Sequence, residues 1–289
     1  VNSGDIVDGV VVGKFYFNQL QKLVTNSLGS LYENYKPIKV NKGQFLKFDF
    51  TIHNKIIEIF YPEVSIATNT VVKGTINSDN QEFKLNFNSP KITASDNTFD
   101  NIRVKVDNKN PLYNAFIELD SINTKFYKVR DFSLINIKVK DTLIFRTEFK
   151  GGTKGQDYFN LNLYHTINKD NKNVVGFHKS EMKLKNYVWF LNEKESSDNQ
   201  IVFDKSFKNF NFDNIVLTHQ DQEITFMGDI KGNDYKDLKL SFKGVDLNKI
   251  TSSDPSFVVN GNLEAVINYK QDKLVYQPTA SIQIDNLNI

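Results

Sequence analysis

The sequence predicts an all-β protein, and three observations support this fold class. Apolar and polar residues alternate strictly over many short runs, as in strands with one buried face. Clusters of Asn, Gly, Ser and Pro separate these runs at a spacing of roughly 8 to 12 residues, which is typical of hairpin-connected strands. The 24 Phe and 12 Tyr, against 2 Met and 1 Trp, also favour strands.

The alternating runs predict strands whose apolar side chains share one face and whose Lys, Asn and Asp side chains share the other. In residues 83–87, for example, Phe83, Leu85 and Phe87 alternate with Lys84 and Asn86. Similar runs lie at residues 45–50, 102–106, 135–139, 159–163, 238–242 and 263–269.

A short motif recurs three times, as Phe-Asp-Asn-Ile at 99–102 and 212–215 and as Ile-Asp-Asn-Leu at 284–287. The apolar residues of each copy are three apart, so they can share a face only if the Asp-Asn pair breaks the strand register. Asp and Asn suit such a position because they tolerate left-handed backbone angles. The repeat predicts a stacked, elongated β scaffold with an interruption at each pair.

One segment departs from alternation and predicts a helix. Phe17, Leu20, Leu23, Val24, Leu28 and Leu31 follow one another at steps of mostly three or four residues, which indicates a short amphipathic helix over residues 17–32. Because its polar face has few Lys or Arg, we expect this helix to cover an apolar sheet surface or an open end of the sheet instead of a membrane.

Composition limits the function classes. The 36 basic and 34 acidic residues are spread along the chain and give a net charge of +2, so no nucleic acid is expected as a partner. The absence of cysteine excludes disulfides and thiolate chemistry. No run approaches the roughly 18 apolar residues of a membrane-spanning helix.

The chain is expected to be one continuous segment over residues 1–289. Residues 192–200 predict a long exposed loop, but composition does not change across them, so we place no domain boundary there. The chain begins at Val1 without Met and ends at Ile289 inside an apolar alternation, which suggests a portion of a longer protein.

Motifs that carry chemistry are weak, and we expect no enzyme activity, cofactor or metal. The four histidines have no ligand-spaced partner. Residues 151–155 lack the spacing of a phosphate-binding loop, and residues 168–173 lack the Gly and Glu of a calcium loop. No nucleophile elbow is present, and carboxylates on different strands leave no spacing by which a glycosidase pair could be recognised.

Much of the chain resembles the Bacteroidota branch of the TamB family, within the AsmA-like proteins. The resemblance is carried by Phe-Asp-Asn-Ile-Val-Leu at 212–217, Gly228 within 224–230, and Leu-Lys-Leu-Ser-Phe-Lys-Gly-Val-Asp-Leu at 238–247. The resemblance continues through Gly-Asn-Leu at 261–263 and through residues 278–289. Earlier segments of the chain also resemble the family, at residues 70–74, 87–92, 149–152 and 161–167.

The resemblance implies an elongated β-sheet bent into a U-shaped groove with an apolar interior. It implies a non-enzymatic scaffold in the periplasm that conducts phospholipids, or other acyl-chain lipids, between the inner and outer membranes. A TamA- or BamA-type outer-membrane barrel protein would be a partner in outer-membrane biogenesis. The family's inner-membrane anchor would lie outside this chain.

Alternation together with the resemblance predicts which side chains line the groove. The predicted lining is Phe83, Leu85, Phe87, Ile102, Val104, Val106, Ile135, Ile137, Val139, Phe159, Leu161, Leu163, Leu238, Leu240, Phe242, Leu263, Ala265 and Ile267. The alternative is an extracellular β-sandwich binding or adhesin module, in which a second sheet would cover the same face. Trp189 lies in an apolar stretch and is expected to be buried, which argues against an exposed aromatic binding loop.

Overall fold

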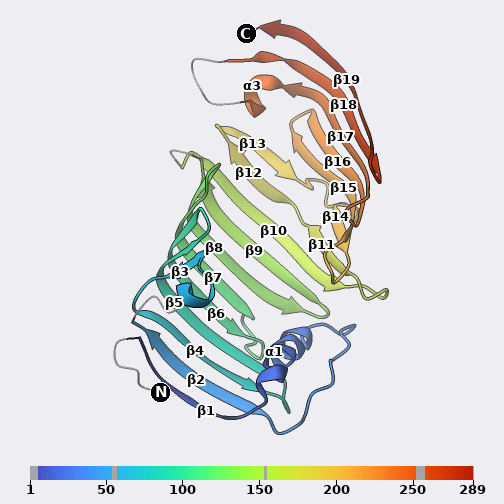
Figure 1. The fold of residues 1–289 in the computed structure, drawn as a ribbon. Coiled ribbons are helices and arrows are strands. Elements are labelled where there is room, and N and C mark those ends of the chain that lie inside the picture. The colour runs from blue at the N-terminus through green and yellow to red at the C-terminus, as the bar shows by residue number, and fades with distance from the viewer. Residues whose placement is uncertain (1–5, 54–56, 153–154, 252–257, 289) are drawn as a thin grey trace. The chain divides into compact units, whose positions relative to one another are not determined.

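The structure is a computed structural model that describes residues 6–53, 57–152, 155–251 and 258–288 (Figure 1). Strands make up 64% and helices 7% of it. The all-β prediction, with one short helix near the N terminus, is therefore confirmed. The chain forms two compact units, unit 1 (Val1–Gly155) and unit 2 (Gln156–Ile289). A single continuous groove over residues 1–289 stays a prediction.

Unit 1 contains one antiparallel sheet in which most neighbouring strands are also neighbours in sequence. Strands β1 and β2 pair with each other, β2 pairs with β4, and β4 to β9 follow in chain order, while β3 pairs with the second half of β5. The strands are β1 (Val7–Lys14), β2 (Phe45–Ile52), β3 (Val64–Ile66), β4 (Thr70–Asn77), β5 (Glu82–Ala94), β6 (Asn97–Asp107), β7 (Ala115–Asn123), β8 (Lys128–Val139) and β9 (Thr142–Gly151).

The predicted amphipathic helix is present as α1 (Leu20–Gly29), preceded by the 3-10 turn η1 (Phe17–Gln19). Its Leu23 is 2% exposed and packs in a core cluster with Leu46, Ile76 and Phe83 of the sheet. The prediction that this helix covers an apolar sheet surface is confirmed. A further single helical turn, α2 (Ile57–Phe60), precedes β3.

Unit 2 is also antiparallel, with two short strand pairs side by side between two long strands. The first half of β10 pairs with β12, β12 pairs with β13, and β13 pairs with β15. The second half of β10 pairs with β11, β11 pairs with β14, and β14 also pairs with β15. Strands β15 to β19 then pair in chain order. The elements are β10 (Asp157–Ile167), β11 (Asn173–Phe177), β12 (Ser180–Leu184), β13 (Tyr187–Leu191), β14 (Gln200–Phe203), β15 (Asn209–His219), β16 (Gln222–Lys231), β17 (Tyr235–Asp246), α3 (Leu247–Ile250), β18 (Asn260–Asp272) and β19 (Val275–Asn288).

Two of the three Asp-Asn pairs interrupt the strand register as predicted. In β15 the register shifts between Phe212, opposite Gly228, and Ile215, opposite Phe226. From Phe212 to Ile215 the chain advances three steps in β15, while the paired residues advance only two steps in β16. Phe212 and Ile215 therefore share a face. In β19 the register shifts next to Asn286, whose φ is +56°.

The first Asp-Asn pair behaves differently. Asn101 has the expected left-handed backbone, with φ +50°. However, Ile102 pairs with Ser89 and Asp100 pairs with Lys91, so the register is the same on both sides. The predicted register shift at this pair is wrong, because Pro90 of β5 lies opposite Asn101 and no extra residue is inserted.

Candidate functional site

One face of the sheet of unit 1 is apolar. Residues opposite one another in antiparallel strands point to the same side, and the register places apolar residues in rows across the strands. One row consists of Phe50, Val72, Phe87, Val104, Ile117 and Leu134, all half-buried. The predicted lining residues Phe83, Leu85, Phe87, Ile102, Val104 and Val106 lie together on this face.

The predicted lining residues of β8 lie on the other face. Ile135 stands opposite Phe116, which stands opposite Lys105 on the polar side of β6. Ile137 and Val139 follow at steps of two and share that side; the three are 38%, 40% and 47% exposed. Assigning Ile135, Ile137 and Val139 to the apolar face is therefore wrong. Leu134 takes that place in β8.

Unit 2 has an apolar face of the same kind, and the predicted residues lie on it. Leu240 stands between Phe226 and Ile267, and the next row places Phe242 opposite Ala265. The members predicted from sequence are Phe159, Leu161, Leu163, Leu238, Leu240, Phe242, Leu263, Ala265 and Ile267, of which only Leu263 and Ala265 are fully buried.

A run of phenylalanine rings crosses this face and is absent from the predicted lining. Ring centroids of Phe203 and Phe210 are 5.6 Å apart, those of Phe210 and Phe212 are 6.1 Å apart, and those of Phe212 and Phe226 are 5.0 Å apart. All four rings are half-buried. The sequence holds a signal for two of these rings, since Phe210 and Phe212 alternate with Asn209 and Asn211 directly before the second Asp-Asn pair.

One rim of the apolar face of unit 2 is sealed by a core cluster. Trp189 of β13 and Val245 of β17 are both 0% exposed and pack with Leu247 of α3 and with Leu263 and Ala265 of β18. The expected burial of Trp189 is confirmed.

The helical turn α3 joins the two sides of this rim. Lys185 donates to the backbone oxygen of Asn248 at 2.9 Å, and the Lys249 ammonium lies 5.2 Å from the ring of Tyr187. The β12–β13 hairpin is thus held against the β17–β18 side, so the sheet of unit 2 curves around its own apolar face, as Figure 1 also shows.

In unit 1, α1 covers one rim, and buried amides fix it there. Asn108 accepts a hydrogen bond from the Phe83 N–H at 2.9 Å and donates to the carbonyl oxygens of Ser27 (2.6 Å) and Gln81 (2.7 Å). Asn26 donates to the Ile38 carbonyl at 2.7 Å and accepts from the Ile38 N–H at 2.8 Å. Since both amides are about 95% buried, α1 is a fixed part of the face.

His165 is a titratable side chain on the apolar face of unit 2. His165 stands opposite Val175, which stands opposite Ile201. Burial lowers the pKa of His165 below its ordinary value of 6.5, and a hydrogen bond between His165 and Asn173 acts in the opposite direction. The imidazole is therefore held in its neutral form, which suits an apolar surface.

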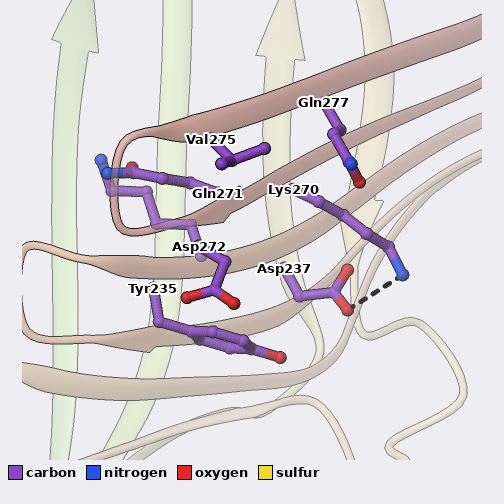
Figure 2. A pocket seen from close by; sticks show the side chains of 8 residues that line it. Tyr235, Asp237, Lys270, Gln271, Asp272, Val275 and Gln277 are labelled. Carbon is purple, nitrogen blue, oxygen red and sulfur yellow. Dashed lines mark ion pairs between the residues drawn. The ribbon is translucent and has the colours of Figure 1, made fainter.

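The opposite face of each sheet is polar and carries exposed ion pairs, such as Lys73–Asp49 at 3.0 Å and Arg103–Glu118 at 3.6 Å. A depression of about 380 Å³ lies on this side of unit 2, and Figure 2 shows that the Lys270–Asp237 ion pair (3.4 Å) and Tyr235 line it. Within this depression the charges of Lys270 and Asp237 neutralise each other.

Clusters that could bind a metal ion are lacking in the part of the chain that the structure describes. No group of three His, Cys, Asp or Glu side chains there could hold a metal ion. The loop at 168–173 closes on itself through Asn168, whose N–H donates to the Lys172 carbonyl at 3.0 Å. At the start of the Gly151–Gly155 segment, the ring of Tyr127 lies where a side chain on Gly151 would stand.

Comparison with protein-family models, with curated proteins and with solved structures finds no match to this chain. No helix in the described ranges is long and apolar enough to cross a membrane. The family resemblance therefore stays a prediction, and functional inference rests on the two apolar faces.

Proposed function

We propose that this chain is a non-enzymatic lipid-binding scaffold whose two apolar sheet faces hold acyl chains. It would act in the periplasm and conduct phospholipids between the inner and outer membranes, as the resemblance to the TamB family implies. A TamA- or BamA-type barrel would be its outer-membrane partner, and inner-membrane attachment would come from a region outside residues 1–289.

The observation that supports the proposal is the half-buried state of the apolar faces. A sheet normally buries its apolar face against a second layer. Here, among the described residues, α1 covers one rim of the apolar face of unit 1, and α3 covers one rim of the apolar face of unit 2. Away from these rims, Phe87 and Val104 of unit 1 and Phe226 and Leu240 of unit 2 stay half-buried. A contiguous apolar surface of this kind is typical of a binding site.

The same observation weighs against the β-sandwich alternative. A sandwich fills the space above its inner face with side chains of a second sheet about 10 Å away. Its central residues would then be fully buried, as Trp189 and Val245 are at the sealed rim. The open part of the face does not have this burial.

A matched pair of substitutions tests the proposal. Leu240 and Lys239 are adjacent in β17 and point to opposite faces. Leu240→Glu places a carboxylate in the acyl-chain path, where it is poorly solvated, whereas Lys239→Glu changes only the polar face. We expect phospholipid bound after incubation with phosphatidylglycerol and phosphatidylethanolamine vesicles, measured by mass spectrometry of the repurified protein, to fall at least severalfold in the first variant only.

Trp189 provides a second readout, because it packs beside Phe242 and Leu217 of the apolar face and is the only tryptophan. Phospholipid with brominated acyl chains should quench its fluorescence in the wild type and in Lys239→Glu. Circular dichroism of each variant checks that the sheet is intact. Absence of bound lipid from the wild type, or equal losses in the two folded variants, would contradict the proposal.

A further inference from the structure

The turn between β7 and β8 presents an aromatic ring to solvent. Phe126 is 87% exposed and Tyr127 is 38% exposed. The hydroxyl of Thr124 accepts hydrogen bonds from the N–H groups of Phe126 (3.3 Å) and Tyr127 (3.0 Å), and the Thr124 N–H donates to the Tyr127 carbonyl at 3.1 Å. Because these bonds fix the backbone of the turn, the ring of Phe126 is held outward by the local structure.

This turn lies at the rim of unit 1 opposite α1. Asn108, directly after β6, donates to the Ser27 carbonyl of α1, so α1 lies at the rim where β6 ends. Strand β7 runs antiparallel to β6 from Ala115 to Asn123 and carries the chain to the other rim. The β7–β8 turn therefore lies away from the helix that covers the apolar face.

Tyr127 joins the turn to the apolar face. Thr147 of β9 stands opposite Leu134 on that face. Gly151 lies an even number of residues further along the same strand, so it shares the side of Thr147. The ring of Tyr127 lies where a side chain on Gly151 would stand. The turn thus places one ring in solvent, at Phe126, and a second ring on the apolar face.

The charges next to Phe126 are all basic. Residues 121–130 contain Lys125, Lys128 and Arg130 and no acidic residue, and all three cations are exposed. The Lys125 ammonium lies 5.5 Å from the centre of the Phe126 ring. Asp131, next in sequence, pairs with a lysine of β9 at 2.9 Å. The turn therefore combines a protruding apolar ring with a local positive charge.

We propose that the β7–β8 turn docks on a bilayer surface that contains anionic phospholipid, with the Phe126 ring inserted among the acyl chains. Aromatic and basic residues side by side are typical of segments that bind at a membrane interface. Lipid phosphates would pair with the cations, since basic residues near an anionic bilayer are attracted to it. Asp96, in the neighbouring β5–β6 turn, is a single acid against these three cations.

A bilayer fits this turn better than a protein partner does. A stable protein interface buries about 800 Å² on each side, and its centre is an apolar patch with few charges. The turn instead offers one outward ring surrounded by cations. Insertion into a bilayer needs no matching surface on the partner. Docking goes beyond the proposed function, because it requires no lipid on the sheet faces, but it would set the open rim of unit 1 against a membrane.

A fluorescent label at the turn tests the insertion. The chain contains no cysteine, so Phe126→Cys provides a single attachment site for a polarity-sensitive nitrobenzoxadiazole dye. With vesicles of phosphatidylglycerol and phosphatidylethanolamine, we expect the emission to shift to the blue and to rise severalfold. Leu112→Cys is the matched control, since Leu112 is 76% exposed in the β6–β7 loop at the other rim; its label should show no change.

Reversal of charge at the turn tests the electrostatic part. Each basic residue near an anionic bilayer strengthens binding roughly fivefold, so Lys125→Glu combined with Lys128→Glu should weaken flotation with these vesicles at least tenfold. The control is Lys239→Glu combined with Lys243→Glu, two exposed residues of β17 in unit 2, which changes the net charge equally. This variant should bind vesicles nearly as the wild type does. Circular dichroism checks the fold of both variants.

Each outcome decides the proposal. A blue shift at position 126 alone, with weaker flotation of the turn variant alone, supports docking. A wild type that does not float with anionic vesicles, as expected if the turn binds an acidic protein, would overturn it, as would equal label changes or equal losses in the paired variants. Flotation without lipid on the repurified protein would contradict only the proposed function, whereas bound lipid without flotation would contradict only docking.

Discussion

Replacing Gly228 with alanine should strongly destabilise unit 2. Gly228 lies in β16 with φ +140°, a backbone conformation that is essentially restricted to glycine. A Cβ at this position would overlap the carbonyl oxygen of Asp237 and come within 2.8 Å of the Leu238 Cα. Both contacts are with the backbone of β17, so they can be relieved only by moving the two strands apart.

The magnitude follows from these two effects. The conformation costs about 1–3 kcal/mol for a residue with a side chain, and overpacking adds about 1–3 kcal/mol. We therefore expect the free energy of unfolding to fall by about 2–6 kcal/mol. Gly232→Ala is the matched control, since Gly232 has φ +60° and open space around its Cβ position; it should lose only about 1–2 kcal/mol.

Urea unfolding followed by the fluorescence of Trp189 measures both variants, because this tryptophan is buried in unit 2. A lower midpoint for Gly228→Ala than for Gly232→Ala is the expected order. If Gly228→Ala is no less stable than Gly232→Ala, the close approach of β16 and β17 at this point is wrong.

Three further predictions concern buried polar groups. Asn108→Ala leaves the Phe83 N–H and the Ser27 carbonyl without their partner and should lower stability by about 2–4 kcal/mol, whereas Asn80→Ala, in an exposed turn, should change the urea midpoint little. The lowered pKa of His165 means that the unfolded chain binds more protons than the native chain, so stability is full above pH 6.5 and declines as pH falls below it; His165→Leu should remove part of this decline. Trp189 should show blue-shifted emission in the native state, since its side chain is 0% exposed, and a spectrum like that of the urea-unfolded chain would contradict its burial.

Alternation alone was sufficient to predict most strands and most of the apolar face. It works because the side-chain period of two is fixed by backbone geometry, whatever the neighbouring strands are. Runs such as 83–87 and 238–242 contain only one apolar set, so their inward face is unambiguous. Phe226 is absent from the predicted lining because Met227 and Gly228 interrupt the alternation of residues 224–230.

The wrong face assignment of Ile135, Ile137 and Val139 in β8 has a physical cause that the sequence of a single strand does not show. Residues 132–139 hold two apolar sets, and alternation with Ile135 and Ile137 predicts that Asn136 points to the polar face. In the structure Asn136 is 3% exposed, lies on the apolar side, and accepts a hydrogen bond from the Ala115 N–H. An asparagine at a rim can therefore point inward when it serves the backbone of the next strand, as Asn108 also does, and only the register with β7 shows this.

Chain-order pairing also determines how such a sheet can change length. From β5 to β8 every strand pairs with the strand before it and the strand after it. Duplication of one hairpin within this series would insert two strands and leave the neighbouring registers unchanged. Since strands lie about 4.8 Å apart, each duplication would lengthen the apolar face by about 10 Å, so the span of such a protein can evolve in hairpin-sized steps.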